Sequence, residues 1–355
     1  MVASRSCLRP SSRERERPTM RIPATGAIFI AVVFSIGPIA YAKAKPNHAA
    51  PELVEAHDAI ARGSLAFVAQ TGALAIYDIT DPANPSWLGK LARPGEVWAV
   101  ALEGEIAYLA VGTRGIAAVN VSRPEEPRLL GLYDTVGTVH GVAVQGGVVA
   151  VADGARGLEI VSFVDPARPK ALASLPSRDA ARAVSWRGTL LASAEGNAGV
   201  RLLDMTNPTA PHRLSQVERP LPALDAALCE GDLLLVAAGE AGLRVWDVSE
   251  PARPVEAGSV ALEGRVRSVS CAGKLAVAGC GDHGVAMVDL SAPGAPHVVG
   301  AVPRVGGYPA ERVFLAGTLV LVATGAGGLG VLSIEDPAAP ITLLPRARKM
   351  QIHFP

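Results

Sequence analysis

The 355-residue sequence has no excess of charge of either sign, because 33 lysine and arginine residues balance 33 aspartate and glutamate residues. Proteins that attract nucleic acid or an acidic membrane surface through their overall field carry a positive excess, which this chain lacks. We therefore expect no nucleic-acid partner. Charge is also sparse, at 19% of residues against 49% apolar ones, and that much apolar material excludes a disordered chain.

Cysteine is scarce as well, with four residues in the whole chain. So few cysteines do not make a disulfide scaffold, and none stands in a Cys-x-x-Cys or Cys/His spacing that would hold zinc. We therefore expect neither a metal nor another cofactor.

Long apolar runs are missing: the run from Ala27 to Ile36 is well short of the roughly 20 residues that a membrane span needs. Arg21 precedes this run and the small-x-small sequence ending at Ala42 follows it, which is the order of a secretory signal peptide. We expect residues 1–42 to be this signal region, with cleavage after Ala42. The true start is expected at Met20, and an unusually long charged segment before the apolar run is the alternative. The protein would then be periplasmic, cell-surface or secreted. An uncleaved signal anchor is the alternative, and it would be the only attachment to a membrane.

Glycine and proline are abundant, with 37 and 28 residues, and they argue against long helices. A Pro-x-x-Pro tetrad recurs, and the first prolines of successive tetrads are 42, 42, 42, 43, 42 and 44 residues apart. The tetrads begin at Pro82, Pro124, Pro166, Pro208, Pro251, Pro293 and Pro337. These seven copies fill the chain after the signal region and leave no room for a second domain.

Each copy contains four short apolar runs, which in the third copy are residues 141–144, 148–152, 158–161 and 170–173. Runs this short, rich in Val, Leu and Ile and bounded by Gly and Pro, are typical of strands. Four antiparallel strands per roughly 42 residues is the spacing of a propeller blade. We predict an all-β, seven-bladed β-propeller over residues 57–347. A β-solenoid is the alternative, although its coils are usually shorter.

The flanking segments are short. Residues 43–56 are expected to form a linker or an additional strand at the seam between the first and last blades, and residues 348–355 a C-terminal tail.

The repeats resemble a known family. Residues 73–85, ALAIYDITDPANP, and residues 242–254, GLRVWDVSEPARP, are similar to the LVIVD repeat of bacterial and archaeal surface or periplasmic propellers. This resemblance implies an exported β-propeller protein, and it brings no catalytic residues with it.

Several repeated polar residues and glycines have a structural explanation. A short polar side chain ends the third run of each copy, at Asp78, Asn120, Ser162, Asp204, Asp247, Asp289 and Ser333. Four residues before a proline, such a side chain caps a turn by accepting backbone N–H bonds, so we do not interpret these residues as metal ligands. Glycines recur just before the third run, at Gly115, Gly157, Gly199, Gly242, Gly284 and Gly328. We expect loops with positive φ there, and no dinucleotide site because no helix follows.

The cysteines of the later repeats fall into the same scheme. Cys229 and Cys271 occupy the position that holds Leu102 in another copy, so we interpret them as small, buried apolar residues. Cys280 lies in a glycine-rich loop, where we expect it to be more exposed.

One position does not look structural: six residues before the glycine of the first turn, every copy has a large residue. This channel-mouth ring consists of His57, Trp98, His140, Arg182, Asp225, Arg267 and Glu311. The first strand of a blade is innermost, so its first residues converge at one mouth of the central channel. The loops between the second and third strands open on the same face. They add the charged residues Arg114, Asp153, Arg156, Glu195, Glu240, Asp282 and His283.

A concave mouth lined by polar groups that differ between blades is the usual place for a ligand, although a wide, wet channel mouth also accepts any polar residue. His57, His140 and Glu311 have metal-binding or acid–base side chains, as does Asp225. They belong to blades 1, 3, 7 and 5, which is too dispersed for a tight metal shell.

We therefore expect an exported, monomeric, non-enzymatic propeller that binds an unknown protein or extracellular ligand through this face. A propeller hydrolase of the lactonase type is the first alternative; it rests on fold analogy and needs a divalent metal near Glu311 and His57. A purely structural protein of the cell envelope is the second.

Overall fold

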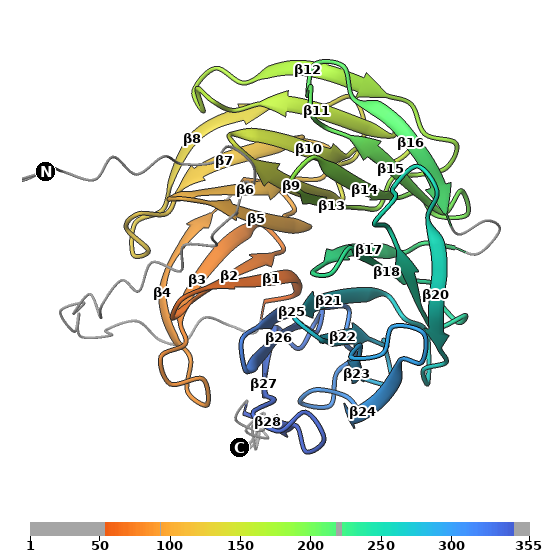
Figure 1. The fold of residues 1–355 in the computed structure, drawn as a ribbon. Coiled ribbons are helices and arrows are strands. Elements are labelled where there is room, and N and C mark those ends of the chain that lie inside the picture. Colours follow the sequence, from red (N-terminus) through yellow and green to blue (C-terminus); the bar gives the residue numbers. More distant parts are fainter. Residues whose placement is uncertain (1–53, 93, 218–221, 344–355) are drawn as a thin grey trace, which may run out of the picture. The chain divides into compact units, whose positions relative to one another are not determined.

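The computed structural model describes residues 54–92, 94–217 and 222–343. The predicted signal region, with Met20 and Ala42, and the predicted tail lie outside these residues. All regular structure in the described part is β-strand, arranged as seven four-stranded antiparallel sheets around a centre (Figure 1). The predicted seven-bladed β-propeller is thus confirmed. The described residues contain no helix long and apolar enough to cross a membrane.

Every blade uses its four strands in chain order, from the innermost strand to the outermost. The innermost strands are β1 (Ala56–Arg62), β5 (Ala99–Glu103), β9 (Gly141–Gln145), β13 (Ala183–Arg187), β17 (Asp225–Cys229), β21 (Ser268–Ala272) and β25 (Arg312–Ala316). The second strands are β2 (Leu65–Gln70), β6 (Ile106–Ala110), β10 (Val148–Ala152), β14 (Leu190–Ala194), β18 (Leu233–Ala237), β22 (Leu275–Gly279) and β26 (Leu319–Ala323). The third strands are β3 (Ala73–Asp78), β7 (Ile116–Asn120), β11 (Leu158–Ser162), β15 (Val200–Asp204), β19 (Leu243–Asp247), β23 (Val285–Asp289) and β27 (Leu329–Ser333). The outermost strands are β4 (Ser86–Ala92), β8 (Arg128–Tyr133), β12 (Lys170–Leu175), β16 (His212–Val217), β20 (Val255–Val260), β24 (His297–Val302) and β28 (Ile341–Thr342).

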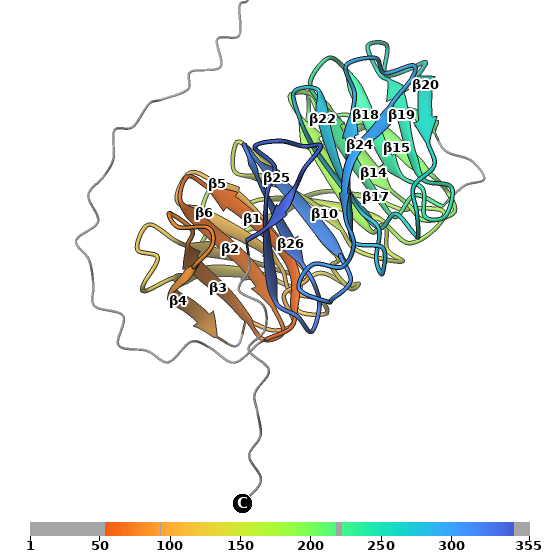
Figure 2. The same cartoon turned by 90° about the horizontal axis from the view of Figure 1, so that it is seen from below.

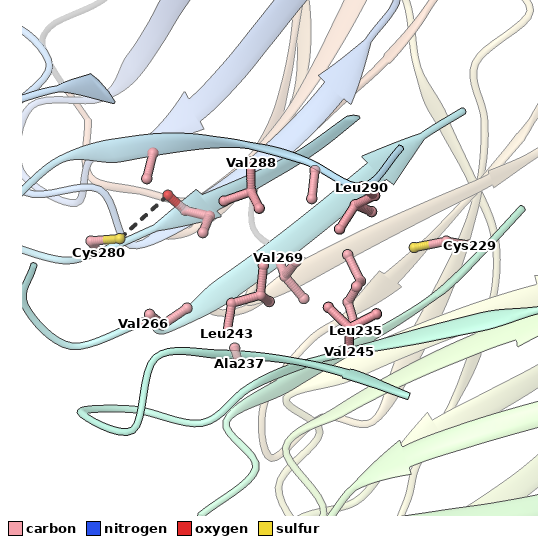
Figure 3. Packing of buried hydrophobic residues seen from close by; sticks show 13 residues of the cluster. Cys229, Leu235, Ala237, Leu243, Val245, Val266, Val269, Cys280, Val288 and Leu290 are labelled. Atoms are coloured by element: carbon pink, nitrogen blue, oxygen red, sulfur yellow. Dashed lines mark hydrogen bonds between the residues drawn. The ribbon is translucent and has the colours of Figure 1, made fainter. Parts of the chain in front are cut away.

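The hydrophobic core lies between blades. Seven clusters of buried apolar residues each combine side chains from two neighbouring blades. In the cluster between blades 5 and 6, Leu235 and Val245 pack with Val269 and Val288 (Figure 3). Second and third strands are covered on both faces, which explains why their sequences are nearly continuous apolar runs. Each large side chain buried in this way contributes roughly 1.5–3 kcal/mol.

Within the described residues, the first and last blades exchange no strand where the ring closes. The last blade completes itself, since Ile341 of β28 pairs with Ser333 of β27. Strand β1 of the first blade lies beside β25 and β26 of the last (Figure 2). There the Ala56 N–H donates to the Gly325 carbonyl at 2.9 Å and the Gly325 N–H donates back at 3.1 Å. The same kind of bridge joins other neighbouring blades, for example at Gly112 and Val139.

The additional seam strand falls mostly outside the described residues. Val54 is described and is not in a strand, whereas residues 52 and 53 are not described.

Six of the seven turn caps predicted from the repeats are present; among the described residues, Ser333 makes no such bond. The Asp78 carboxylate accepts the Thr80 N–H at 2.8 Å, and the Asp247 carboxylate accepts the Ser249 N–H at 2.9 Å. Equivalent bonds are made by Asn120, Asp204 and Asp289, and a longer one by Ser162. The loop glycines have positive φ, as at Gly284, where φ is +78° and a Cβ atom would overlap the Val302 carbonyl.

The proline tetrads pack against the outermost strand of the preceding blade. Gly131 of β8 lies so close to the Pro166 carbonyl that a Cβ atom would overlap it. In blade 4, Ser215 stands at the equivalent position and donates its hydroxyl to the Pro251 carbonyl at 2.6 Å. The tetrads are thus part of the contact between blades.

Substituting Gly131→Ala is expected to lower the free energy of unfolding by about 1–3 kcal/mol, because the added methyl group must displace backbone in a packed contact. The matched control is Ala173→Gly at the equivalent position of β12, which is expected to cost about 0.5–1 kcal/mol. Urea unfolding of both variants measures the difference. Equal stability of Gly131→Ala and the wild type would contradict this close contact.

Candidate functional site

A cavity of about 660 Å³ lies at one mouth of the central channel. Six of the seven predicted ring residues line it: His57, Trp98, His140, Arg182, Arg267 and Glu311. The sequence had not indicated several other lining residues, among them Glu55, Leu224, Arg265, Tyr308 and Arg312. The structure therefore brings most of the predicted ring together around a single hollow.

The backbone holds the ring residues in equivalent places. The Trp98 N–H donates to the Ala110 carbonyl at 2.9 Å, and the His140 N–H donates to the Ala152 carbonyl at 2.9 Å. The same bond to the end of the second strand is made by Arg182, Leu224, Arg267 and Glu311. A uniform scaffold thus presents a side chain that differs from blade to blade.

Asp225 does not line the cavity; Leu224 occupies the ring position of blade 5. The first turn of this blade has three residues between Cys229 and Leu233, whereas the turn of blade 3 has two. Counting six residues back from Gly231 therefore reaches Asp225, which is one residue after the true ring position at Leu224. Asp225 itself is buried, and its carboxylate accepts the N–H of its neighbour Ala226 at 2.9 Å and that of Val269 in blade 6 at 3.1 Å.

Three aromatic rings form a continuous arc on blades 1 to 3. The rings of His57 and Trp98 are 4.5 Å apart, and the His140 ring meets Trp98 edge-on at 6.1 Å. A His57 ring nitrogen also hydrogen-bonds the Thr71 hydroxyl at 3.0 Å. Burial lowers the pKa of both histidines, and the nearby guanidinium groups of Arg182 and Arg312 lower that of His140 further. Both imidazoles are therefore mainly neutral at pH 7.

Three arginines face the cavity from blade 4 and from the connection between blades 5 and 6. Arg182, Arg265 and Arg267 are all exposed at the mouth. Arg267 forms an ion pair with Glu311. Among the residues that the structure describes, Arg182 and Arg265 form no ion pair.

A fourth arginine lies between two carboxylates in the channel. The Arg312 guanidinium is 3.8 Å from the Asp225 carboxylate. Asp58 is the counterpart of Asp225 in blade 1, because its carboxylate accepts the N–H groups of Ala59 and, in blade 2, Val100. Burial alone would lower the pKa of Arg312, but Asp225 and Asp58 raise it above its ordinary value. Arg312 is therefore a permanent cation within the channel.

The seven charged loop residues predicted on this face do not line the cavity. Asp153 is buried and accepts hydrogen bonds from the Thr135 hydroxyl and the Gly137 N–H, both at 2.9 Å. Glu195 is buried in an ion pair with Arg201 at 2.6 Å. These two carboxylates hold loops in place. The remaining five are Arg114, Arg156, Glu240, Asp282 and His283, of which Asp282 pairs with Arg304 at 2.9 Å and Glu240 lines a smaller hollow beside Arg265.

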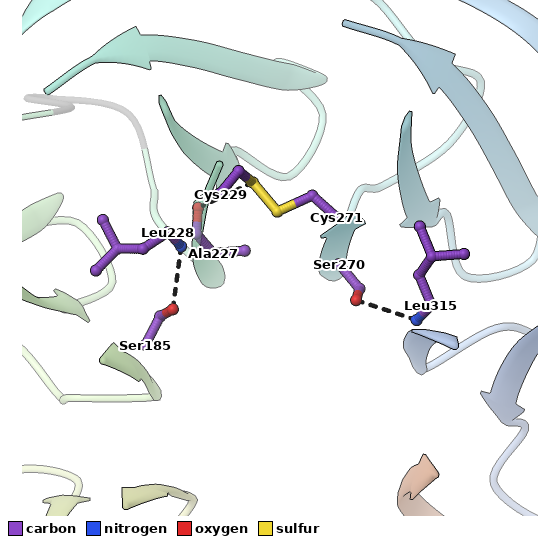
Figure 4. The surroundings of a disulfide bond; sticks show 7 residues. All are labelled: Ser185, Ala227, Leu228, Cys229, Ser270, Cys271 and Leu315. Carbon is purple, nitrogen blue, oxygen red and sulfur yellow. Dashed lines mark hydrogen bonds between the residues drawn. A yellow bond between two sulfur atoms is a disulfide. The ribbon is translucent and has the colours of Figure 1, made fainter. Parts of the chain in front are cut away.

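The prediction for Cys229 and Cys271 is wrong in one respect: the two form a disulfide bond between β17 and β21 (Figure 4). The three-residue turn of blade 5 places Cys229 at the last position of its strand, facing the next blade. Glu103 has this position in blade 2, and its carboxylate accepts two N–H groups from the first turn of blade 3. The same strand position thus links neighbouring blades by hydrogen bonds at Glu103 and by a covalent bond at Cys229.

Cys280 is also not as predicted, because its side chain is buried in the cluster between blades 5 and 6 (Figure 3). Burial raises the pKa of its thiol to about 11, so the residue is largely protonated and unreactive at neutral pH.

The described ranges contain no group of three or more His, Cys, Asp or Glu side chains arranged to hold a metal ion. His57 and Glu311 share the cavity, but each already has a partner in Thr71 and Arg267, respectively.

Solved structures with similar folds are distant in sequence. The computationally designed protein Ika8 superposes with a TM-score of 0.61 at 9% identity, over 80% of this chain and 97% of its own. The WD40 repeats of RRP9 superpose with a TM-score of 0.62 at 14% identity, over 78% of this chain and 89% of their own. At such low identity, these similarities concern the fold alone.

Sequence comparison identifies the repeats more specifically. No curated protein matches the sequence. The LVIVD repeat matches five stretches that together make up more than half of the chain: residues 55–92, 94–135, 136–174, 228–261 and 263–303. The chain therefore belongs to the LVIVD-repeat family.

Proposed function

We propose that this protein is an exported, non-enzymatic binding module whose ligand or partner occupies the cavity at the channel mouth. The main support is the contrast between a uniform scaffold and a varied lining. Equivalent backbone hydrogen bonds hold six of the seven ring positions, those of blades 2 to 7, while the side chains of the ring include indole, imidazole, guanidinium and carboxylate groups. Such variation on a rigid scaffold is the pattern of a recognition surface.

Two features support export. The N-terminal segment has the order of a secretory signal, and a disulfide bond joins Cys229 to Cys271. Structural disulfides persist in oxidising compartments and are rare in the cytosol. We therefore place the protein in the periplasm, on the cell surface or in the external medium.

A hydrolytic role has less support from the geometry. It requires a divalent ion beside His57 and Glu311. Glu311 pairs with Arg267, and Arg182 and Arg265, which form no ion pair among the described residues, oppose the binding of a cation there.

Substituting His140→Ala together with Arg182→Ala is expected to weaken partner binding at least tenfold, because both side chains are removed from the cavity wall. The full chain with a C-terminal tag would be immobilised and exposed to envelope extract of the source organism, and captured molecules would be quantified by mass spectrometry. The control combines Arg168→Ala and Arg253→Ala, two exposed residues in proline turns at the other end of the blades. Unchanged capture by the His140/Arg182 variant, at an unchanged melting temperature, would exclude the channel mouth as the site.

A further inference from the structure

The cavity at the channel mouth is chemically divided. His57, Trp98 and His140 present aromatic rings from blades 1 to 3, whereas Arg182 and Arg265 present guanidinium groups from blades 4 to 6. The innermost strands of these two sets of blades lie on different sides of the central channel (Figure 1). A molecule in the cavity can therefore touch aromatic surface on one side and positive charge on the other.

The lining carries a surplus of positive charge. Four arginines line the cavity against two carboxylates, those of Glu55 and Glu311. Glu311 is engaged by Arg267, and the charge of Arg312 is balanced by the nearby buried carboxylates of Asp225 and Asp58. This leaves Arg182 and Arg265 without an ion pair among the described residues.

Asp179 is a nearby carboxylate, but it has other partners. It accepts hydrogen bonds from the Ala180 N–H at 2.7 Å and from the Asn197 N–H at 2.8 Å. The positive charge of Arg182 helps to lower the pKa of Asp179, but the two side chains form no ion pair in the described part of the chain. Arg182 therefore keeps N–H donors for an external group, and guanidinium donors match the oxygens of a carboxylate or phosphate in pairs.

The aromatic side accepts a flat group. Trp98 is only partly buried, and the His57 ring lies against it at 4.5 Å. A cavity of about 660 Å³ is within the range of small-molecule sites. Its dimensions suit one compact molecule.

We infer that this cavity binds a small organic oxyanion with a planar ring. The carboxylate or phosphate group contacts Arg182 and Arg265, and the ring packs against Trp98. This inference rests on the proposed function, since it names the ligand class for the same site.

The test uses the full chain and ligand-observed NMR with phenyl phosphate and phenylacetate, two probes that combine a ring with an oxyanion. Inorganic phosphate and acetate lack the ring, benzyl alcohol lacks the charge, and benzylamine reverses it. We expect saturable binding of phenyl phosphate, phenylacetate or both up to millimolar concentration, and at least tenfold weaker binding of the other four compounds. A preference for one of the two oxyanions would identify the group that the arginines recognise.

Variants assign the contacts. Combining Arg182→Gln with Arg265→Gln is expected to weaken binding of the aryl oxyanions about tenfold or more, since charge-assisted hydrogen bonds are lost. Trp98→Leu is expected to reduce the affinity of the aryl oxyanions towards that of inorganic phosphate and acetate. The control pair Arg168→Gln and Arg253→Gln removes the same charge at exposed proline turns and should leave binding unchanged. Matching melting temperatures confirm that all variants fold.

Each of the following outcomes would overturn this inference. Equal binding of benzylamine and phenyl phosphate would mean that the site does not select anions, and unchanged binding by the double arginine variant would place the anion elsewhere. If neither aryl oxyanion binds while an envelope partner is still lost on His140→Ala with Arg182→Ala, the ligand class is wrong and the proposed function remains. If neither aryl oxyanion binds and the His140→Ala, Arg182→Ala variant still captures the partner, both proposals fail.

Discussion

Replacing both cysteines of the disulfide, Cys229→Ala with Cys271→Ala, is expected to lower the free energy of unfolding by about 4 kcal/mol. The bond joins residues 42 positions apart, and the chain-entropy relation for a loop of that length gives this magnitude. The bond connects the innermost strands of two neighbouring blades, whose apolar side chains already pack together. Its main effect is therefore to restrict the unfolded chain. Urea unfolding with and without reductant measures the change.

Cys280→Ala provides the matched control, because it removes the buried thiol and leaves the disulfide intact. Reductant should lower the unfolding midpoints of the wild type and of Cys280→Ala by about the same amount, that of the wild type to about the midpoint of the double cysteine variant. The double variant itself should not respond to reductant. A wild-type midpoint insensitive to complete reduction, with free thiols confirmed by mass spectrometry, would contradict the stabilising role.

The architecture was predictable because every blade repeats the same local chemistry. A side chain such as Asp247 caps a turn, a glycine such as Gly284 adopts positive φ, and a proline tetrad packs on the preceding blade. Each of these features requires a particular residue type at a fixed place in the blade, so the same residues recur at a regular period in the sequence. The period predicted the number of blades and the order of strands.

The errors at Cys229 and Asp225 have one physical cause. Side chains alternate between the two faces of a strand, so a shift of one residue reverses the direction of each side chain. The 43-residue interval between Pro208 and Pro251 reveals an additional residue but not its place in the first turn. The disulfide depends on the additional residue lying in the first turn of blade 5. Only then is Cys229 the last residue of its strand, where its side chain faces Cys271 of blade 6.

Arg265 and Arg312 were missed for a different reason. Arg265 precedes the ring position of blade 6 by two residues, and Arg312 follows that of blade 7 by one. Whether such neighbours reach the cavity depends on the curvature of the whole ring. A repeat pattern in the sequence does not contain that information.

Substituting Arg312→Met is expected to destabilise the protein by about 2–3 kcal/mol at neutral pH. The substitution keeps an apolar stem in the channel and removes the positive charge near Asp225 and Asp58. Their carboxylates are buried, and an uncompensated charge in such a place is costly. The value lies below that of a fully buried pair because 27% of the Arg312 side chain is exposed. The control is Arg304→Met, which breaks an exposed ion pair with Asp282 and should change stability by less than about 1 kcal/mol.

The dependence of this loss on pH separates charge from packing. Burial raises the pKa of Asp58 in the folded protein, and Arg312 opposes this rise. Without Arg312 the folded-state pKa of Asp58 rises further. A carboxyl group with a raised folded-state pKa favours folding in acid, and this contribution is lost as the pH rises through that pKa. The deficit of Arg312→Met should therefore be largest at neutral pH and shrink as the pH falls towards about 4. Adding Asp58→Asn to Arg312→Met should restore part of the stability at pH 7. A deficit that is constant with pH would instead assign the loss to packing of the arginine stem.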